Sequence, residues 1–322
     1  MNTRSLSLFK SIGTIMVLVA YTLFFLVFLF SCAPNGSPQE RSFKVVATIY
    51  PIYDMAKQVG GSRVEVVCLM DTGESPHTFE FTPDRVKRLQ GADIALKVGL
   101  GLDDWLEGTI RSLDQDIEVH DIHRGIDLMG EECSHAHESD DHNNNAHGSN
   151  DHNHHVNPHI WLSLENAKAI VGNIQSIFSE NFPEYDSYFI ENKNRYIQEI
   201  DKLDTEFRKE AEGFGKKEFI AHHDAWVYLA RDLGLKQVMS VEPFPGKEPT
   251  PAYIIQLQKT IDNYEIDTIL IEPQLSADVV NFLTQDMDLE VRVLDPLGGT
   301  EGTETYLDMM SYNFGQLKDA LR

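Results

Sequence analysis

Short apolar runs that alternate with amphipathic stretches are the feature that most constrains the fold of this chain. Runs rich in Val and Ile, such as Phe43–Ile49 and Val64–Leu69, have the length and composition of buried strands. Pro51–Val59 and Pro83–Leu89 begin with Pro, which favours a helix start, and continue with helical spacing. Strands that alternate with helices predict an α/β domain with a mainly parallel sheet. Further elements expected here are strands at Ile94–Val98 and Ile117–Ile122 and a helix at Asp103–Leu113.

The same alternation resumes in the last third of the chain and predicts a second α/β domain. Between the two, residues 185–212 contain no Gly or Pro, and many of their apolar side chains recur at intervals of three, four and seven. A helix over this segment would be about 42 Å long, enough to run along both domains. We therefore expect an N-terminal lobe at 43–184, a connecting helix at 185–212 and a C-terminal lobe at 213–322. The strands expected in the C-terminal lobe are Glu218–Ala221, Gln237–Val241, Asp267–Ile271 and Val291–Leu294, and the helices are Asp224–Leu233, Pro251–Asn263, Ala277–Met287 and Thr303–Leu321.

The N-terminal segment predicts export. Two basic residues precede the apolar run Ile12–Phe30, and a small residue and Cys32 follow it, which is typical of a secretory signal. A Cys at this place resembles a bacterial lipoprotein signal, in which Cys32 carries lipid. We expect a signal peptide at 1–31, a tether at 32–42, and a mature chain anchored by lipid in the periplasm or at the cell surface. An uncleaved anchor helix over the apolar run is the alternative.

The net charge and the histidine content limit the classes of function that the chain can have. The chain has 27 Lys+Arg against 51 Asp+Glu, a formal charge of −24, which argues against nucleic-acid binding because phosphates are repelled. Residues 130–157 are expected to form a mobile loop, since 134–155 have no large apolar side chain. Its histidines either collect metal weakly or belong to a dispensable tether. They are His135, His137, His142, His147, His152, His154 and His155.

Four other residues are candidate metal ligands because of their places relative to the predicted strands. His77 lies in a turn after one strand, whereas His223 and Asp295 directly follow two others; His159 lies where the His-rich loop ends. Ligands of open α/β sheets bind beyond the carboxyl ends of strands. Three neutral imidazoles suit Zn²⁺, with a carboxylate or water completing a tetrahedron. Side chains alternate along a strand, so only one of His223 and its neighbour His222 should face the site.

Four motifs, in order along the chain, resemble one family: SPHTFEFTP, NPHIWLS, HHDAW and VLDPLG. Together with the opening VVATIYPIYDMAKQVGG, they are similar to the zinc and manganese solute-binding proteins of bacterial ABC transporters. The resemblance covers residue 43 to the C-terminus and implies two Rossmann-like α/β lobes joined by one long rigid helix, with a metal between them. The family's ligand positions fall on His77, His159 and His223, and Asp295 matches a fourth position that is a ligand in some members and water in others. His222 matches a position that is usually apolar.

The donor set favours zinc over manganese. The resemblance places His223 where manganese-type members have a carboxylate, and nitrogen-rich sites prefer Zn²⁺ to Mn²⁺. A His-rich loop is also typical of the zinc members. We therefore expect a monomer that captures Zn²⁺ between its lobes and delivers it to the membrane permease of an ABC importer, with an affinity that falls below about pH 6.5.

Two alternatives stay open at this point. One is a manganese- or iron-binding member of the same family that acts in uptake or as a surface adhesin. The other is a zinc hydrolase, which the lack of an HExxH pair disfavours. A bridge between Cys68 and Cys133 is equally left open.

Overall fold

The computed structural model describes residues 43–113, 115–130, 156–276 and 278–322, which belong to one compact unit, Ser42–Arg322. The predicted signal peptide, the tether with Cys32, and the histidines from His135 to His155 lie outside the described residues, as does Cys133. Within the described part of the chain, no helix combines the length and apolar character that a membrane span requires.

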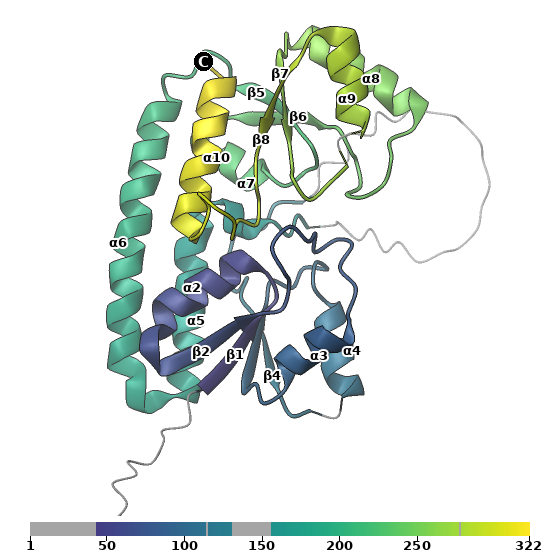
Figure 1. Ribbon diagram of the computed structural model, residues 1–322. Helices are drawn as coiled ribbons and strands as arrows, with labels where there is room; N and C mark the ends of the chain where they lie inside the picture. The colour runs from purple at the N-terminus through teal and green to yellow at the C-terminus, as the bar shows by residue number, and fades with distance from the viewer. Residues whose placement is uncertain (1–42, 114, 131–155, 277) are drawn as a thin grey trace, which may run out of the picture. The chain divides into compact units, whose positions relative to one another are not determined.

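The first lobe contains a four-stranded parallel sheet with the order β2-β1-β3-β4 (Figure 1). Alternate residues of the central strand β1 pack on opposite faces: Val45 and Ala47 join the core that includes α2 and α5, and Val46 joins the one that includes α3 and α4. The strands are β1 (Phe43–Ala47), β2 (Val64–Cys68), β3 (Ile94–Lys97) and β4 (Glu118–Asp121), and the helices are α2 (Tyr50–Gly60), α3 (Pro83–Leu89), α4 (Trp105–Ser112) and α5 (Leu164–Asn181).

The second lobe repeats this arrangement with the order β6-β5-β7-β8, again all parallel. Ile220 of the central strand β5 packs with α8 and α9, whereas Phe219 and Ala221 join the core that includes α7 and α10. The strands are β5 (Glu218–Ala221), β6 (Lys236–Ser240), β7 (Thr268–Ile271) and β8 (Glu290–Val293), and the helices are α7 (Val227–Leu233), α8 (Pro251–Asn263), α9 (Asp278–Met287) and α10 (Tyr306–Ala320).

Helix α6 (Asp186–Ala211) contacts helices of both lobes: α2 and α5 in the first, and α7 and α10 in the second (Figure 1). Near its start Phe189 packs on Phe178 of α5, with ring centroids 5.5 Å apart. Near its end Phe207 stacks on Phe314 of α10 at 3.9 Å. The predicted fold, two α/β lobes with parallel sheets joined by one long helix, is confirmed.

Two details differ from the sequence prediction. Helix α5 was not predicted, although Ser163 caps it by accepting a hydrogen bond from the Asn166 amide (3.0 Å) and its buried residues recur at helical spacing. Helix α7 begins at Val227 and not at Asp224, because the Ala225 amide donates to the His223 carbonyl (2.9 Å) and closes a turn there. This turn follows the candidate ligand His223 directly.

Candidate metal centre

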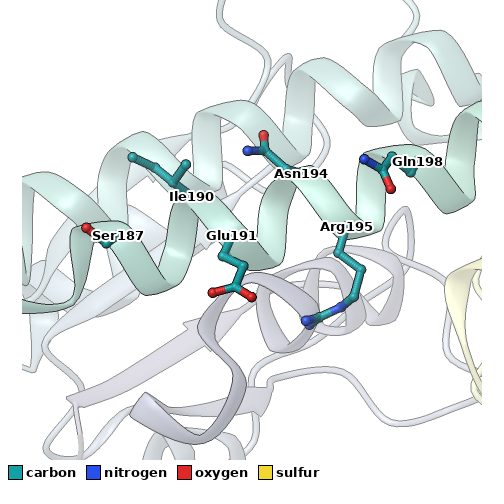
Figure 2. A pocket seen from close by; sticks show the side chains of 6 residues that line it. All are labelled: Ser187, Ile190, Glu191, Asn194, Arg195 and Gln198. Carbon is teal, nitrogen blue, oxygen red and sulfur yellow. The ribbon is translucent and has the colours of Figure 1, made fainter.

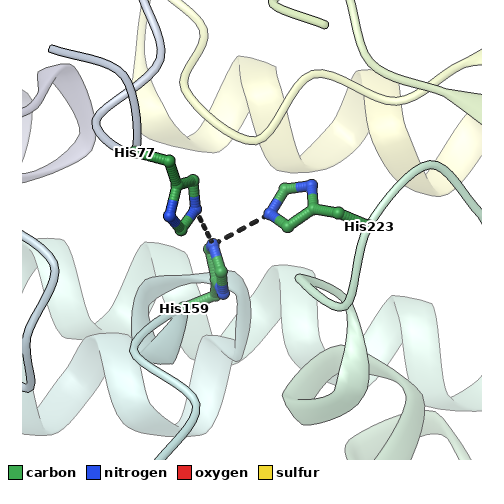
Figure 3. A group of neighbouring side chains, drawn as sticks. All are labelled: His77, His159 and His223. Carbon is green, nitrogen blue, oxygen red and sulfur yellow. Dashed lines mark hydrogen bonds between the residues drawn. The ribbon is translucent and has the colours of Figure 1, made fainter. Parts of the chain in front are cut away.

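Three imidazoles from distant parts of the chain converge on one point (Figure 3). Nε2 of His159 lies 3.0 Å from Nε2 of His77 and 3.0 Å from Nε2 of His223. Two nitrogens bound to one tetrahedral zinc ion at about 2.0–2.1 Å are about 3.3 Å apart. Small shifts of these side chains are therefore enough for all three to bind a single ion. Among the clustered His, Cys, Asp and Glu side chains of the described residues, the group that could hold a metal ion is His77, His159 and His223.

His77 and His159 come from two turns of the first lobe. The turn at 75–78 places Pro76 before His77 and is closed by the Thr78 amide, which donates to the Ser75 carbonyl (3.2 Å). His77 is exposed as a residue, although its Nε2 points toward the other two rings (Figure 3). His159 precedes the short 3₁₀ helix Ile160–Leu162 and is buried.

Asn157 fixes the orientation of His159. Its Oδ1 lies 2.9 Å from His159 Nδ1 and accepts the His159 backbone amide at 3.0 Å. Because an amide oxygen only accepts, Nδ1 must carry the proton, which leaves the lone pair of Nε2 available for a metal. The Asn157 amide group in turn donates to the Asp224 carbonyl of the second lobe.

Glu272 lies behind His223 as a charged neighbour, without the hydrogen-bond alignment that Asn157 has with His159. His223 follows β5, and its Nδ1 lies 2.8 Å from Glu272 Oε1. Glu272 is 2% exposed and also accepts a hydrogen bond from Trp226 Nε1 (3.3 Å). A carboxylate behind a ligating imidazole fixes its tautomer and makes it a stronger donor to a metal. The sequence analysis missed Glu272 and Asn157; Glu272 directly follows β7, the same kind of strand-end position that singled out Asp295.

His222 lies outside the group. It is fully buried, its Nδ1 accepts the Glu272 amide (3.2 Å), and its Nε2 is 3.6 Å from Glu242 Oε1. Both neighbours contact Glu272, His222 at its backbone amide and His223 at its carboxylate, but only His223 belongs to the group of three imidazoles.

Asp295 is also not part of the group. Its Oδ1 accepts hydrogen bonds from Gln274 Nε2 (2.7 Å) and from the amides of Leu297 and Gly298 (3.0 Å each). The side chain is therefore engaged in the turn after β8, and its role as a fourth ligand stays a prediction.

The environment keeps two of the imidazoles neutral. Although His77 is exposed as a residue, its ring lies against the other two imidazoles, and this desolvation, together with the nearby charge of His223, lowers the pKa of His77 to about 3. Burial also lowers the pKa of His159 well below its ordinary value, and His223 and His77 add to the effect. Proton competition at these two residues should accordingly begin well below the pH of about 6.5 expected from free imidazole.

A hollow of about 470 Å³ lies on α6 and is lined by Ser187, Ile190, Glu191, Asn194, Arg195 and Gln198 (Figure 2). All six residues come from one helix, and none of the candidate ligands is among them. The chemistry of the molecule therefore centres on the three histidines and not on this hollow.

Fold and site together define a two-lobed α/β protein with a candidate metal centre between its lobes. The family described as "Zinc-uptake complex component A periplasmic" matches residues 45–320, and the chain belongs to this family.

Relatives with known names agree with that assignment. The chain is 33% identical to the high-affinity zinc uptake system protein ZnuA of Bacillus subtilis (strain 168), over 89% of this chain and 91% of that protein. It is 30% identical to the zinc-binding lipoprotein AdcA of Streptococcus pneumoniae (strain ATCC BAA-255 / R6), over 91% of this chain but only 58% of AdcA. The chain therefore spans little more than half of AdcA.

Solved structures show the same fold. The metal-dependent lipoprotein YcdH of Bacillus subtilis is 28% identical, with a TM-score of 0.68 over 87% of this chain and 99% of that one. A crystal structure of ZnuA has a TM-score of 0.75 over 87% of this chain and 100% of that one; at 22% identity it supports the fold alone.

Proposed function

We propose that this protein captures Zn²⁺ between its lobes and delivers it to an ABC-type importer. The observation that carries the proposal is that Nε2 of His77 and Nε2 of His223 each lie 3.0 Å from Nε2 of His159, with the ligand atoms of all three residues within 4.8 Å of one another. His77 and His159 bind from the first lobe, and His223 binds from the second. The relatives named as zinc uptake and zinc-binding proteins support the same cargo.

Zinc fits this donor set better than manganese or iron. All three converging atoms are imidazole nitrogens, and Zn²⁺ lies above Mn²⁺ and Fe²⁺ in affinity for such ligands. A fourth position is filled by Asp295 or by water.

The test is a zinc titration of the purified chain against a competing chelator, with Mn²⁺ titrated in parallel. We expect one tight zinc site and much weaker manganese binding. His159→Ala should remove the tight site, whereas His222→Ala, at an equally buried residue outside the group, should keep it. Tight binding that survives His159→Ala, or a preference for Mn²⁺, would contradict the proposal.

Carriage, and not hydrolysis, is the role we assign to the bound ion. A zinc hydrolase needs a base beside the metal-bound water. Glu272 lies at Nδ1 of His223, away from the Nε2 that faces the group, and so it supports a ligand instead of a water. The zinc-loaded protein should therefore turn over no ester, peptide or lactam substrate; measurable turnover that is lost with His159→Ala would favour the hydrolase.

The location we propose is outside the cytoplasmic membrane, with the monomer anchored through lipid on Cys32. The support is the signal-like N-terminal sequence and the lipoprotein relatives. Labelling of cells with a radioactive fatty acid should mark the wild-type chain and not Cys32→Ala. Equal labelling of both would contradict lipid attachment at this residue.

The histidines from His135 to His155 are proposed as weak auxiliary zinc ligands, on the basis of composition alone. Deleting 134–155 should remove weak sites in the zinc titration and leave one tight site. Loss of the tight site would show that capture and holding are not separate.

A further inference from the structure

Of the segments that carry the three histidines, the one with His77 is a long loop without regular secondary structure. Residues 69–82, here named the His77 loop, connect β2 to α3 without a helix or strand. His159 and His223 are 4% and 3% exposed, but His77 is exposed. The position of its Nε2 therefore depends on whatever holds this loop in place.

Arg85 of α3 binds the first turn of the His77 loop. Its Nη2 donates to Asp71 Oδ2 (2.5 Å) and to both carboxylate oxygens of Glu74 (2.9 Å each). The Glu74 carboxylate also accepts a hydrogen bond from the Asp71 amide (2.8 Å). The turn is therefore held both by this bond within the loop and by the Arg85 guanidinium of α3. The same guanidinium, with that of Arg88, holds the pKa of Asp71 well below its usual range.

The two ends of the His77 loop are fixed separately. Arg88 donates from Nη1 to the carbonyls of Cys68 and Leu69 (3.1 and 3.2 Å) at the beginning. At the end, Phe79 packs on Trp105 of α4 with ring centroids 4.5 Å apart. What lies between, including His77, is linked to α3 by the Arg85 contacts and by Arg88, whose Nη2 donates to Asp71 Oδ1 (2.8 Å).

Arg85 is suited to this task because it is buried. The residue is 6% exposed, and its Nη1 has no hydrogen-bond partner. The two loop carboxylates bound to Nη2 are therefore the groups that offset the cost of burying this charge. Movement of the turn away from α3 would leave a buried cation without its partners. The Arg85 side of these ion pairs is buried, whereas the side chains of Asp71 and Glu74 are 55% and 39% exposed, so the resistance to displacement comes from the cost of leaving the guanidinium unpaired.

We propose that Arg85, with Glu74 and Asp71, is a positioning group that holds the His77 imidazole in the metal centre and so sets how long zinc is retained. The inference rests on the proposed function, because it requires His77 to be a ligand. Arg85 touches no ion itself and acts through the loop.

The test measures zinc dissociation with an excess of chelator for Arg85→Gln and Glu74→Gln. Glu74 is partly exposed, so Glu74→Gln tests the same contact with little risk to folding. We expect dissociation about tenfold faster in both, at the lower end of what loss of a ligand's outer support costs. The control is Arg208→Gln, which removes an ion pair within α6 (Nε to Asp204 Oδ1, 2.9 Å) and a hydrogen bond to the Asp232 carbonyl of α7 (2.5 Å), touches neither the His77 loop nor a ligand, and should leave the rate unchanged.

A second background separates positioning from general stability. In His77→Ala the loop no longer carries a ligand, so adding Arg85→Gln should change zinc affinity no further. The absorption spectrum of bound Co²⁺ should shift in Arg85→Gln toward that of His77→Ala, because the coordination changes in the same direction. Equal rates in wild type and Glu74→Gln, or an undiminished effect of Arg85→Gln in His77→Ala, would overturn this inference. If His77→Ala itself binds zinc as wild type does, the proposed ligand set is wrong instead.

Discussion

The two lobes share one strand order but hold their histidines differently. In the second lobe, His223 is the second residue after the last of β5, and Glu272, directly after β7, lies behind its ring. In the first lobe, His77 is the ninth residue after β2 and lies on an irregular loop. Equal topology therefore does not give His77 and His223 equal surroundings, and we expect the longer connection after β2 to hold its histidine less rigidly. We expect the second lobe to provide a fixed donor and the His77 loop an adjustable one.

Removal of the fixed donor should have the largest effect. His223→Ala takes away one of three converging nitrogens, so zinc affinity should fall by more than the 10- to 100-fold, roughly, that loss of an outer partner costs. His222→Ala, one residue away, should change affinity little and lower the free energy of unfolding by about 1–3 kcal/mol, since the Glu272 amide loses its acceptor. Chelator competition and urea unfolding measure the two effects. The reverse order would contradict the assignment of the two neighbours.

The supports behind the two buried imidazoles should come next. Glu272→Gln removes the charge behind His223, and Asn157→Ala removes the acceptor behind His159. Each should weaken zinc binding by about tenfold or somewhat more, because the ring loses its fixed tautomer or part of its donor strength. Isothermal titration can compare them directly. An unchanged affinity in Glu272→Gln would mean that the second lobe is not the better supported one.

Much of this fold was predictable because local signals agree with it. Phe43–Ile49 is apolar enough to be a buried central strand, and Pro83 marks the start of a helix that the structure begins at the same residue. Helix α5 was missed although Ser163 and its buried periodic residues were visible in the sequence. Strand order is a different matter, since it depends on pairing between distant segments.

The candidate site was predictable only in part. The motifs pointed to His77, His159 and His223, and the structure brings these three together. Glu272 and Asn157 could not be paired with their imidazoles beforehand, because those contacts arise from how β7 and the turn before His159 are placed in space. Asp295 stays a prediction: its Oδ1 accepts hydrogen bonds from Gln274 and two backbone amides, and these contacts do not test its place as the fourth ligand.

Acid should affect affinity less than free imidazole would suggest. If His77 and His159 titrated near 6.5, their protonation would cost about 100-fold in affinity at pH 5.5. Because burial lowers the pKa of His77 to about 3 and that of His159 well below normal, we expect these two to contribute little at that pH. Competition titrations at pH 7.5 and 5.5 measure this. A loss of about 100-fold would contradict this expectation, because it would require both imidazoles to titrate near 6.5.

In the metal-free protein, the lowered pKa values of His77 and His159 should make the free energy of unfolding depend on pH. The unfolded chain takes up protons below about pH 6.5, whereas the folded imidazoles do not until much lower pH. Stability from these groups is thus present above about 6.5 and lost as the pH falls toward the folded pKa, by about 1.4 kcal/mol per pH unit for the buried His159. Saturating zinc should raise the unfolding temperature at both pH values but should not make the loss between pH 7.5 and 5.5 smaller, because the protons are taken up by the unfolded chain.

The smallest expected effect on zinc dissociation comes from a substitution where the second lobe contacts the His77 loop. Gly299 has φ +82°, and a Cβ there would lie 2.7 Å from Thr72 Cγ2 and 2.8 Å from Tyr50 Cδ2. Gly302 has nearly the same backbone, φ +85°, but a Cβ there would meet nothing within 4 Å. Gly299→Ala and Gly302→Ala therefore share the backbone strain of about 1–2 kcal/mol and differ in contact with the first lobe.

Gly299→Ala should push the His77 loop outward and speed zinc dissociation a few-fold, while Gly302→Ala leaves the rate as in wild type. Thermal unfolding should show destabilisation in both, because the strained φ is common to them, and more in Gly299→Ala, because its methyl group also meets Thr72 and Tyr50. Stopped-flow dissociation into a chelator measures the difference. If the two variants release zinc at the same rate, the His77 loop accommodates the added methyl group without moving its imidazole. His77 is then held as firmly as His223, the donor that follows β5. In that case the length of chain after a strand would not decide how rigidly a ligand is held, because the Arg85 ion pairs and the Phe79–Trp105 contact compensate for it.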